Sequence, residues 1–179
     1  MKDGLFKTIL YTILGIGIMT ALMTLTSITT PIEGVYIQLA YGYLALFAGV
    51  AGAIPAAIVG FTGHVLFDLI YTDHLWLSWA LSTGALGFVF GFAIRRKSLR
   101  QGVFSEHDMI RFNVVQAVVN IAIFGLIAPT LDVLFYQHST TIVFTQGWIA
   151  SIINLLTVAV FGTITLKLYA NYKLKQNKQ

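Results

Sequence analysis

The sequence of 179 residues contains no cysteine and little charge. Without cysteine the chain can form no disulfide, no thiolate nucleophile and no cysteine-based zinc site. Only 10% of the residues are charged and 57% are hydrophobic, whereas soluble domains carry about a quarter charged residues. This composition excludes an ordinary soluble domain and is typical of an integral membrane protein.

Sequence motifs of nucleotide hydrolysis and of common hydrolases are also missing. The chain has no G-x-x-x-x-G-K-[ST] phosphate loop, no H-E-x-x-H zinc helix and no G-x-S-x-G elbow. We therefore expect no enzymatic activity, no cofactor and no bound metal, and any ATP hydrolysis must come from another chain. The net charge of +4 flanks apolar segments instead of forming a basic patch with aromatics, so no nucleic-acid partner is predicted.

Six apolar segments account for most of the chain. A hydrocarbon core of about 30 Å takes roughly 20 apolar helical residues to cross. The segments are Leu5 to Ile28, Ile37 to Ala51, Ile54 to Tyr71, Leu75 to Ile94, Ile110 to Ile127 and Trp148 to Tyr169. They predict an all-α membrane protein with six transmembrane helices and a single domain over residues 1–179. The second and third segments, joined by a tight Gly- and Pro-containing turn, are compatible with a re-entrant pair.

The positions of the basic residues predict the orientation. All eleven Lys and Arg fall on the cytoplasmic side if the N-terminus is inside, which is the positive-inside pattern. Both termini are then cytoplasmic, and the loops outside are Thr29 to Tyr36, Thr72 to His74 and Pro129 to Gln146. These loops hold acidic residues and histidines but no Lys or Arg. A solute would enter from this outer side.

His64 and Asp68 lie four residues apart in the third segment and so share one helix face, with Asp68 nearer the outer end. Ionisable groups within a span are costly and indicate a ligand or ion site. Three alternatives stay open, the least favoured being an intramembrane enzyme that uses the pair as general acid and base but has no nucleophile to complete the chemistry. The pair could satisfy itself inside the bundle, or, with Asp73 and His74, it could serve a stand-alone carrier or channel for protons or divalent metal.

Amide side chains mark the last two segments. Asn113, Gln116 and Asn120 form one stripe, at spacings of three and four, and Asn154 lies about two turns inside the outer end of the sixth segment. Such amides either clamp neighbouring helices or line a cavity. We favour the clamp for Asn113 and Gln116, and both interpretations are open for the other two.

Aromatic and small residues give two further signals. The outer aromatics are Tyr36, Tyr41, Tyr43, Tyr71, Trp76, Trp79, Tyr136, Phe144 and Trp148. Most suit an interfacial belt, while a subset could stack against a flat ligand. In the first segment Gly17 and Ala21 form a small-xxx-small pair, which lets another helix approach closely in lipid.

Several runs carry a family resemblance: YGYLALFAG (Tyr41 to Gly49), GHVLFDLIYTDHLWLSWA (Gly63 to Ala80), RFNVVQ (Arg111 to Gln116), and APTLDVLFY with VFTQG (Ala128 to Gly147), followed by GTITLKLYA. Together they resemble the S components of energy-coupling factor (ECF) type ABC transporters. The resemblance implies a six-helix substrate-capture subunit for vitamin uptake in the prokaryotic cell membrane. It also implies three partners, a membrane coupling subunit (T component) and two ATPase subunits.

The resemblance places the ligand between the outer loops and outer helix ends. The predicted substrate-binding residues are Gln38, Tyr41, His64, Asp68, Trp76, Trp79, Asn120, Asp132, Tyr136 and Asn154, and the predicted partner contacts are Gly17 and Ala21. The sequence departs from the family pattern at Ala40, where a basic residue is frequent, and at Leu77, where a second tryptophan is frequent. With both expected at the pocket rim, a larger or less acidic ligand is favoured. Cobalamin is therefore predicted first, ahead of queuosine or thiamine precursors.

Overall fold

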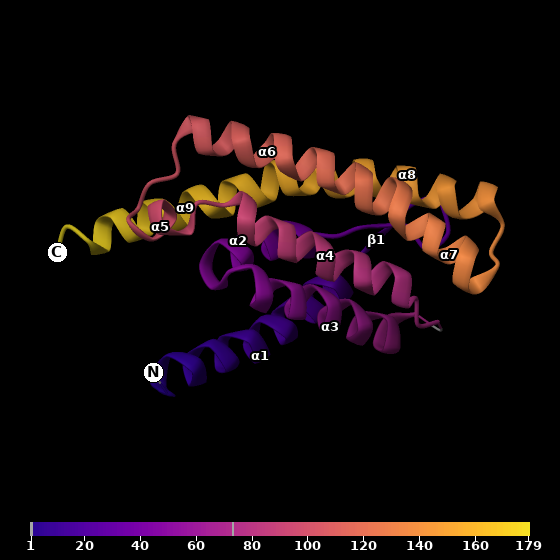
Figure 1. Cartoon of the computed structure of the whole chain (residues 1–179), viewed down its shortest axis with the longest axis horizontal. Coiled ribbons are helices and arrows are strands. Elements are labelled where there is room, and N and C mark those ends of the chain that lie inside the picture. Colours follow the sequence, from indigo (N-terminus) through magenta and orange to yellow (C-terminus); the bar gives the residue numbers. More distant parts are fainter. Residues whose placement is uncertain (1, 73) are drawn as a thin grey trace.

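The computed structural model describes residues 2–72 and 74–179, with the side chains of residues 2–4 excepted, as a bundle of helices along one long axis (Figure 1). The helices are α1 (Lys2–Leu25), α2 (Ala40–Ala51), α3 (Ala53–Tyr71), α4 (Leu77–Ala93), α5 (Arg96–Arg100), α6 (Glu106–Asn120), α7 (Ala128–Tyr136), α8 (Thr140–Thr157) and α9 (Thr163–Gln176). The remaining elements are the π-helical segments η1 (Ile121–Ile127) and η2 (Val158–Gly162) and the strands β1 (Ile28–Thr29) and β2 (Tyr36–Ile37). The two chain ends lie toward the same end of the long axis (Figure 1).

Four helical stretches among the described residues are long and apolar enough to cross a membrane. They are Leu5–Leu25, Ala53–Tyr71, Glu106–Tyr136 and Thr140–Gln176. The helices α2 and α4 are also apolar but shorter. The prediction of an all-α membrane protein is therefore confirmed, whereas the number of crossings and the side of the termini stay predictions.

The start of α6 lies four residues earlier than the predicted Ile110. The Ser105 hydroxyl accepts a hydrogen bond from the Asp108 backbone N–H at 3.2 Å, and Asp108 Oδ2 accepts one from the Ser105 backbone N–H at 3.1 Å. This reciprocal capping box satisfies two N–H groups that a helix start otherwise leaves without partners. The helix can therefore begin at Glu106.

The prediction of an outer loop over Pro129 to Gln146 is wrong, because most of these residues belong to α7 and α8. Proline has no N–H to donate, and in an α-helix its ring clashes with the carbonyl four residues before it. Here η1 directly precedes α7, and its wider turns use i→i+5 hydrogen bonds. The helix therefore continues past Pro129 to Tyr136, where Gln137 takes a left-handed conformation with φ of 55°. Only residues 137–139 connect α7 to α8.

A small hairpin joins α1 to α2, a feature that the sequence analysis did not predict. The strands β1 and β2 are antiparallel, with Ile28 opposite Ile37. Gln38 ties this hairpin to the end of α1, because its Nε2 donates to Met23 O at 3.2 Å and to Ser27 Oγ at 2.8 Å. The first helix accordingly ends at Leu25 instead of the predicted Ile28.

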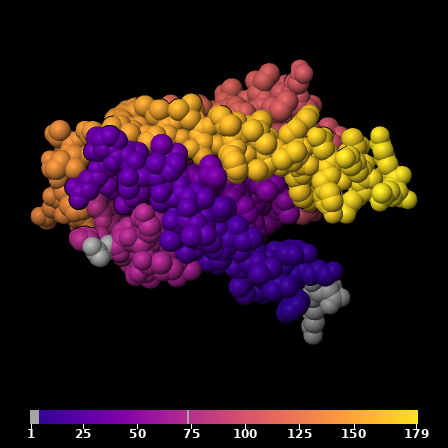
Figure 2. Space-filling view, turned by 180° about the vertical axis from the view of Figure 1, so that it is seen from behind, coloured from indigo at the N-terminus to yellow at the C-terminus, as the bar shows by residue number. Residues whose placement is uncertain are grey.

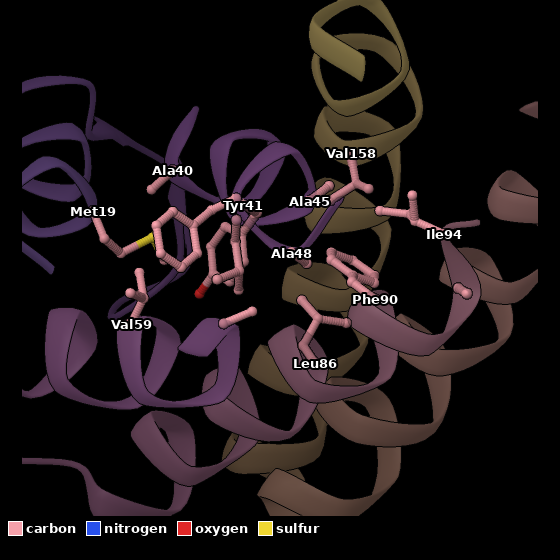
Figure 3. Packing of buried hydrophobic residues seen from close by; sticks show 14 of the residues in the cluster. Met19, Ala40, Tyr41, Ala45, Ala48, Val59, Leu86, Phe90, Ile94 and Val158 are labelled. Carbon is pink, nitrogen blue, oxygen red and sulfur yellow. The ribbon is translucent and has the colours of Figure 1, made fainter. Parts of the chain in front are cut away.

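The hydrophobic core runs through both halves of the bundle, and Figure 3 shows its part between α1, α2, α3, α4 and η2, with apolar side chains such as Met19, Val59 and Leu86. The helices α3 and α4 approach very closely, since a Cβ atom at Gly60 would lie only 2.6 Å from the Thr83 carbonyl oxygen. Small residues of this kind allow backbones to approach within lipid, where the hydrophobic effect does not drive helices together.

Amide side chains clamp the helices of the second half. Asn113 Nδ2 on α6 donates to Thr163 Oγ1 on α9 at 2.9 Å. Gln116 Nε2, one turn further along α6, donates to the Leu155 carbonyl oxygen on α8 at 3.2 Å. The predicted clamping role of these two amides is confirmed.

The helix α1 is packed less than the others. Figure 2 shows its N-terminal part, in indigo, projecting from the body of the molecule. The apolar stretch of α1 is 22% buried, against 39% for α3. Gly17 and Ala21 are both exposed, and no described atom outside the helix's own neighbouring backbone lies within 4 Å of a Cβ built at Gly17. This face of α1 is open to another helix.

Candidate functional site: a cavity at the end of the bundle opposite the chain termini

A cavity of about 600 Å³ lies among the connections at the end of the bundle opposite the chain termini (Figure 1). Its walls come from the hairpin, the start of α2, the outer part of α3, the α3–α4 connection, the start of α4, the α7–α8 connection and α8. Its volume falls in the range of about 300–1,000 Å³ that is typical of small-molecule sites.

The structure brings seven of the ten predicted substrate-binding residues to this cavity. They are Gln38, Tyr41, His64, Asp68, Trp76, Trp79 and Asn154. Residues from both halves of the chain therefore meet in one place, because Asn154 on α8 lines the same cavity as Tyr41 on α2 and His64 on α3. Their role in binding stays a prediction.

The His64 and Asp68 side chains are both buried, with His64 Nε2 at 3.6 Å from Asp68 Oδ1. His64 Nδ1 lies 2.7 Å from Thr83 Oγ1. The Thr83 hydroxyl also lies 3.0 Å from the Trp79 carbonyl oxygen, so its single proton can serve either that oxygen or His64 Nδ1. His64 therefore connects Thr83 on α4 to Asp68 on α3.

The other oxygen of Asp68 shapes the α3–α4 connection. Asp68 Oδ2 accepts a hydrogen bond from the Trp76 backbone N–H at 3.0 Å. Thr72 adds a second bond inside this turn, from its hydroxyl to the His74 carbonyl oxygen at 2.7 Å. The carboxylate therefore fixes the backbone that carries Trp76 while its first oxygen stays available to the cavity.

The cation-carrier alternative gains little from this geometry. Asp73, one of the residues named for it, lies outside the described residues. Within the described part of the chain, no group of three or more His, Cys, Asp or Glu side chains is arranged to hold a metal ion. A divalent metal would be left with the His64–Asp68 pair.

Two clusters of aromatic rings line the cavity. Tyr36 meets Phe67 and Tyr71 edge to face at centroid distances of 5.9 and 5.8 Å, and Phe67 stacks on Tyr71 at 5.1 Å. In the second cluster Trp76 contacts Trp79 at 6.3 Å and His138 at 5.5 Å. The rings of these two clusters are candidates for the predicted aromatics that stack against the ligand, because such ring faces suit a flat molecule.

Asp132 supports the cavity without lining it. This aspartate on α7 is fully buried, and its Oδ2 accepts from the Trp79 indole N–H at 2.7 Å. Its other carboxylate oxygen accepts from the Ser78 hydroxyl. Asp132 therefore links α7 to α4 and fixes the orientation of the Trp79 ring.

Asn120 and Tyr136 also lie away from the cavity lining. Asn120 is fully buried and its Nδ2 donates to both Gln116 O at 2.9 Å and Gln116 Oε1 at 3.1 Å, within α6. Tyr136 is 40% exposed and stacks on His138, which itself lines the cavity, at 5.6 Å. Of the two interpretations of Asn120, the structural one matches its position.

Gln146 is a lining residue that the sequence analysis missed. It is 6% exposed and its Nε2 donates to the Glu33 backbone carbonyl oxygen at 2.9 Å, which connects α8 to the loop between β1 and β2. Gln146 and Asn154 are eight residues apart, so a helix that includes both places them on one face. The sequence analysis did not recognise this shared face because it predicted that the sixth helix begins at Trp148, after Gln146.

The two departures from the family pattern do not lie where they were expected. Ala40 is fully buried in the hydrophobic core, and Leu77 is 41% exposed at the start of α4. Neither is among the described residues that line the cavity. The argument that made cobalamin the first predicted ligand therefore loses its geometric basis.

The described lining of the cavity combines two carboxylates with three histidines, namely His64, His74 and His138. Glu33 and Asp68 contribute carboxylates, and none of the lining residues is Lys or Arg. The Tyr36 hydroxyl senses this environment, because burial raises its pKa and the charges of Tyr71, Asp68 and Glu33 add to the increase. The hydroxyl therefore stays protonated and can donate at neutral pH.

Comparison with known proteins gives one family. The sequence model described as "ECF-type riboflavin transporter, S component" matches residues 5–171. A UPF0397 protein of Lactococcus lactis subsp. cremoris (strain NZ9000) is 41% identical over 175 residues, which cover 98% of this chain and 96% of the relative. A UPF0397 protein of Enterococcus faecalis is 38% identical over 177 residues, with 98% and 97% coverage. No solved structure matches the chain.

Proposed function

The chain belongs to the family of S components of ECF-type riboflavin transporters, and on this premise we propose that its outer cavity captures a flat, vitamin-sized molecule for import. Proteins of this family are substrate-binding transporter subunits and not catalytic ones, and they are embedded in the prokaryotic membrane. The observation that supports capture at this place is the cavity itself, which joins two aromatic clusters to a few converging polar groups.

Riboflavin is the first ligand to test, because the family description names it and its ring system is flat and aromatic. A cavity of about 600 Å³ suits a molecule of that size. Thiamine and queuosine precursors are smaller heteroaromatics with the same general shape. Cobalamin, the ligand predicted first from the sequence, moves to the end of the panel because its corrin ring and nucleotide tail make it far bulkier.

The proposed orientation places both termini in the cytoplasm, with six crossings and one membrane domain over residues 1–179. The position of the chain ends at one end of the bundle, together with the basic residues there, supports this orientation (Figure 1). Because the native chain has no cysteine, single variants Ser139→Cys and Asn177→Cys can be labelled in intact cells with a membrane-impermeant maleimide. We expect label at position 139 and none at 177, and the reverse pattern would overturn the orientation.

The capture role is tested by calorimetric titration of the purified protein, without ATP and without partners. The panel is riboflavin, thiamine, its pyrimidine precursor, a queuosine precursor and cobalamin. We expect saturable one-to-one binding of one compound, accompanied by a change in tryptophan fluorescence because Trp76 and Trp79 line the cavity. Folded protein that binds none of the five would contradict the proposal.

A further inference from the structure

Two arginines of α5 meet at one backbone carbonyl, at the end of the bundle opposite the cavity (Figure 1). The Nη2 atoms of Arg96 and Arg100 donate to the Val50 carbonyl oxygen at 3.1 and 3.0 Å. Like charges four residues apart on one helix repel each other. Burial lowers the pKa of Arg96, and the neighbouring charge of Arg100 lowers it further. An anion against the two guanidiniums would relieve this repulsion.

The two arginines have no acidic partner among the described residues. The neighbouring Arg95 has the Asp108 carboxylate at 3.7 Å, but neither Arg96 nor Arg100 has one at such a distance. A guanidinium carries five N–H donors, and the contact with the shared carbonyl takes one from each side chain. Arg100 is exposed, so its remaining donors are accessible to a partner from outside the chain.

The surrounding backbone fixes the place of this pair. Gly52, between α2 and α3, has a φ of 101°, and a Cβ atom there would lie 2.4 Å from Arg96 Nη1. The Arg96 guanidinium therefore lies directly over the turn, where a glycine leaves room for it. The loop after α5 is attached to α9, because Lys167 Nζ donates to the Phe104 carbonyl oxygen at 3.0 Å. The arginines thus belong to a defined surface.

The position of the pair along the chain corresponds to the edge of a membrane. The apolar helix α4 ends at Ala93, and its last turns expose Phe88 by 42% and Phe92 by 66%. The basic run begins two residues later, at Arg95. In a membrane protein such a change from apolar to basic residues marks the boundary of the hydrocarbon core, next to the phosphates of the lipid headgroups.

Other basic residues make this end of the bundle strongly cationic. Residues 95–100 hold four Lys and Arg, residues 163–179 hold four Lys, and neither stretch contains Asp or Glu. The two stretches lie together, since a Cβ atom at Gly102 would be 2.6 Å from the Leu174 Cα atom. Such a surface attracts anionic lipid, whereas the ammonium group of a zwitterionic lipid gains nothing from it.

We propose that Arg96 and Arg100 form a binding site for the phosphate group of an anionic phospholipid. Guanidiniums bind phosphate oxygens in a bidentate manner, so the two side chains can share the non-bridging oxygens of one phosphodiester. The acyl chains of the same lipid lie along the exposed apolar side chains of α4. The bound lipid balances the charge of the pair and stabilises the contact between α5 and the end of α2. This inference does not depend on what the cavity binds.

Native mass spectrometry of the detergent-purified protein, titrated with phosphatidylglycerol or phosphatidylcholine, tests the site. We expect the first phosphatidylglycerol to bind at least roughly tenfold more tightly than phosphatidylcholine. The double variant Arg96→Gln/Arg100→Gln should lose roughly tenfold in affinity for phosphatidylglycerol. The matched control is Lys175→Gln/Lys178→Gln, which removes the same charge from exposed positions of the C-terminal end, with an expected change of about twofold or less.

Two results of this titration would overturn the proposal. If the wild-type protein binds the two lipids equally, the surface does not select anionic lipid. If the arginine and lysine variants lose the same affinity, net charge alone attracts the lipid and the arginine pair is not a site.

Arg96→Lys/Arg100→Lys keeps the fold testable, because it retains both charges while it removes the planar guanidiniums. We expect a melting temperature close to that of the wild type and roughly three- to tenfold weaker binding of phosphatidylglycerol. Wild-type affinity of this folded variant would overturn the assignment to the guanidinium pair.

Two other occupants of the surface give different results. Displacement of phosphatidylglycerol by millimolar inorganic phosphate would assign the pair to a free anion. If Arg96→Gln/Arg100→Gln binds phosphatidylglycerol like the wild type but no longer copurifies with the membrane coupling subunit, the surface contacts protein. Either result would overturn the lipid site.

Discussion

Two buried aspartates at opposite ends of the bundle use their carboxylates in different ways. Asp108, at the start of α6, accepts from the Ser105 backbone N–H and hydroxyl and lies 3.7 Å from the Arg95 guanidinium. Asp68 accepts one backbone N–H, from Trp76, and otherwise faces His64 and a cavity whose described lining has no Lys or Arg. Asp108 therefore stabilises the start of a helix, whereas Asp68 contributes a carboxylate to the cavity lining. That difference favours the cavity end as the predicted place of ligand capture.

The basic side chains strengthen the contrast. Arg96 and Arg100 both donate to the Val50 carbonyl oxygen, at 3.1 and 3.0 Å, and so cap the end of α2. Lys167 donates to the Phe104 carbonyl oxygen at 3.0 Å in the same half of the molecule. The described cavity lining contains no Lys or Arg, so the two ends of the bundle differ in the basic residues that they carry.

The largest expected effect comes from removing a structural carboxylate of the outer half. Asp132→Ala leaves the Trp79 indole N–H and the Ser78 hydroxyl without their buried acceptor. We expect a loss of about 3 kcal/mol in the free energy of unfolding, a large drop in melting temperature in detergent, and weaker ligand binding because Trp79 loses its orientation. Asp132→Asn, which keeps one acceptor oxygen, should lie between. If Asp132→Ala melts at the wild-type temperature, the contacts of Asp132 with Ser78 and Trp79 do not stabilise this end of the bundle.

A second prediction separates capture from assembly. Gly17→Leu fills the open face of α1, and overpacking of a close helix contact costs about 1–3 kcal/mol. Copurification with the membrane coupling subunit should therefore fall by roughly 10- to 100-fold, while ligand affinity stays unchanged because the cavity is elsewhere. Ala21→Leu should behave alike. The matched control is Ile18→Leu, an exposed large residue on the same helix. Full copurification of Gly17→Leu would assign the coupling interface to another surface.

The third prediction concerns the connection between α8 and the hairpin. Gln146→Ala removes both the bond to the Glu33 carbonyl oxygen and the unpaired Oε1. Loss of about 1–1.5 kcal/mol should raise the rate of ligand dissociation by roughly tenfold with little change in melting temperature. Stopped-flow tryptophan fluorescence measures this rate. Unaltered dissociation would mean that the hairpin does not retain the ligand.

The smallest effect is expected at the end of the bundle opposite the cavity. Ser105→Ala removes the capping box of α6 and should cost about 1 kcal/mol of stability. Ligand affinity should stay at the wild-type value, because the capping box lies at the end opposite the cavity. A shift in affinity as large as that of Gln146→Ala would break the comparison between the two ends.

The helical part of the fold was predictable because hydrophobic runs of this length have few alternatives to a membrane helix. The boundaries were not, and the reasons are local. Pro129 usually ends a helix, but η1 accommodates it here. The hairpin between α1 and α2 is only two residue pairs long, which is too short to leave a pattern in the sequence.

The candidate site was predictable where neighbouring residues of a single segment indicated binding by their chemical type. His64 and Asp68 are ionisable groups four residues apart in a span, and Trp76 and Trp79 are outer aromatics. Gln146 gave no such signal because its importance depends on the start of α8 and on a carbonyl 113 residues away in the chain. Contacts of that separation are set by packing, which composition and spacing do not encode.

The π-helical segment η2 has a consequence for the phase of the helix that contains it. It lies between α8, which carries Gln146 and Asn154 to the cavity, and α9, which extends to the opposite end of the bundle. A π turn arises from one residue more than an α-helix needs, and one residue corresponds to about 100° of rotation about the axis. Deleting Val160 would therefore rotate Gln146 and Asn154 together away from the cavity, although neither residue had been changed.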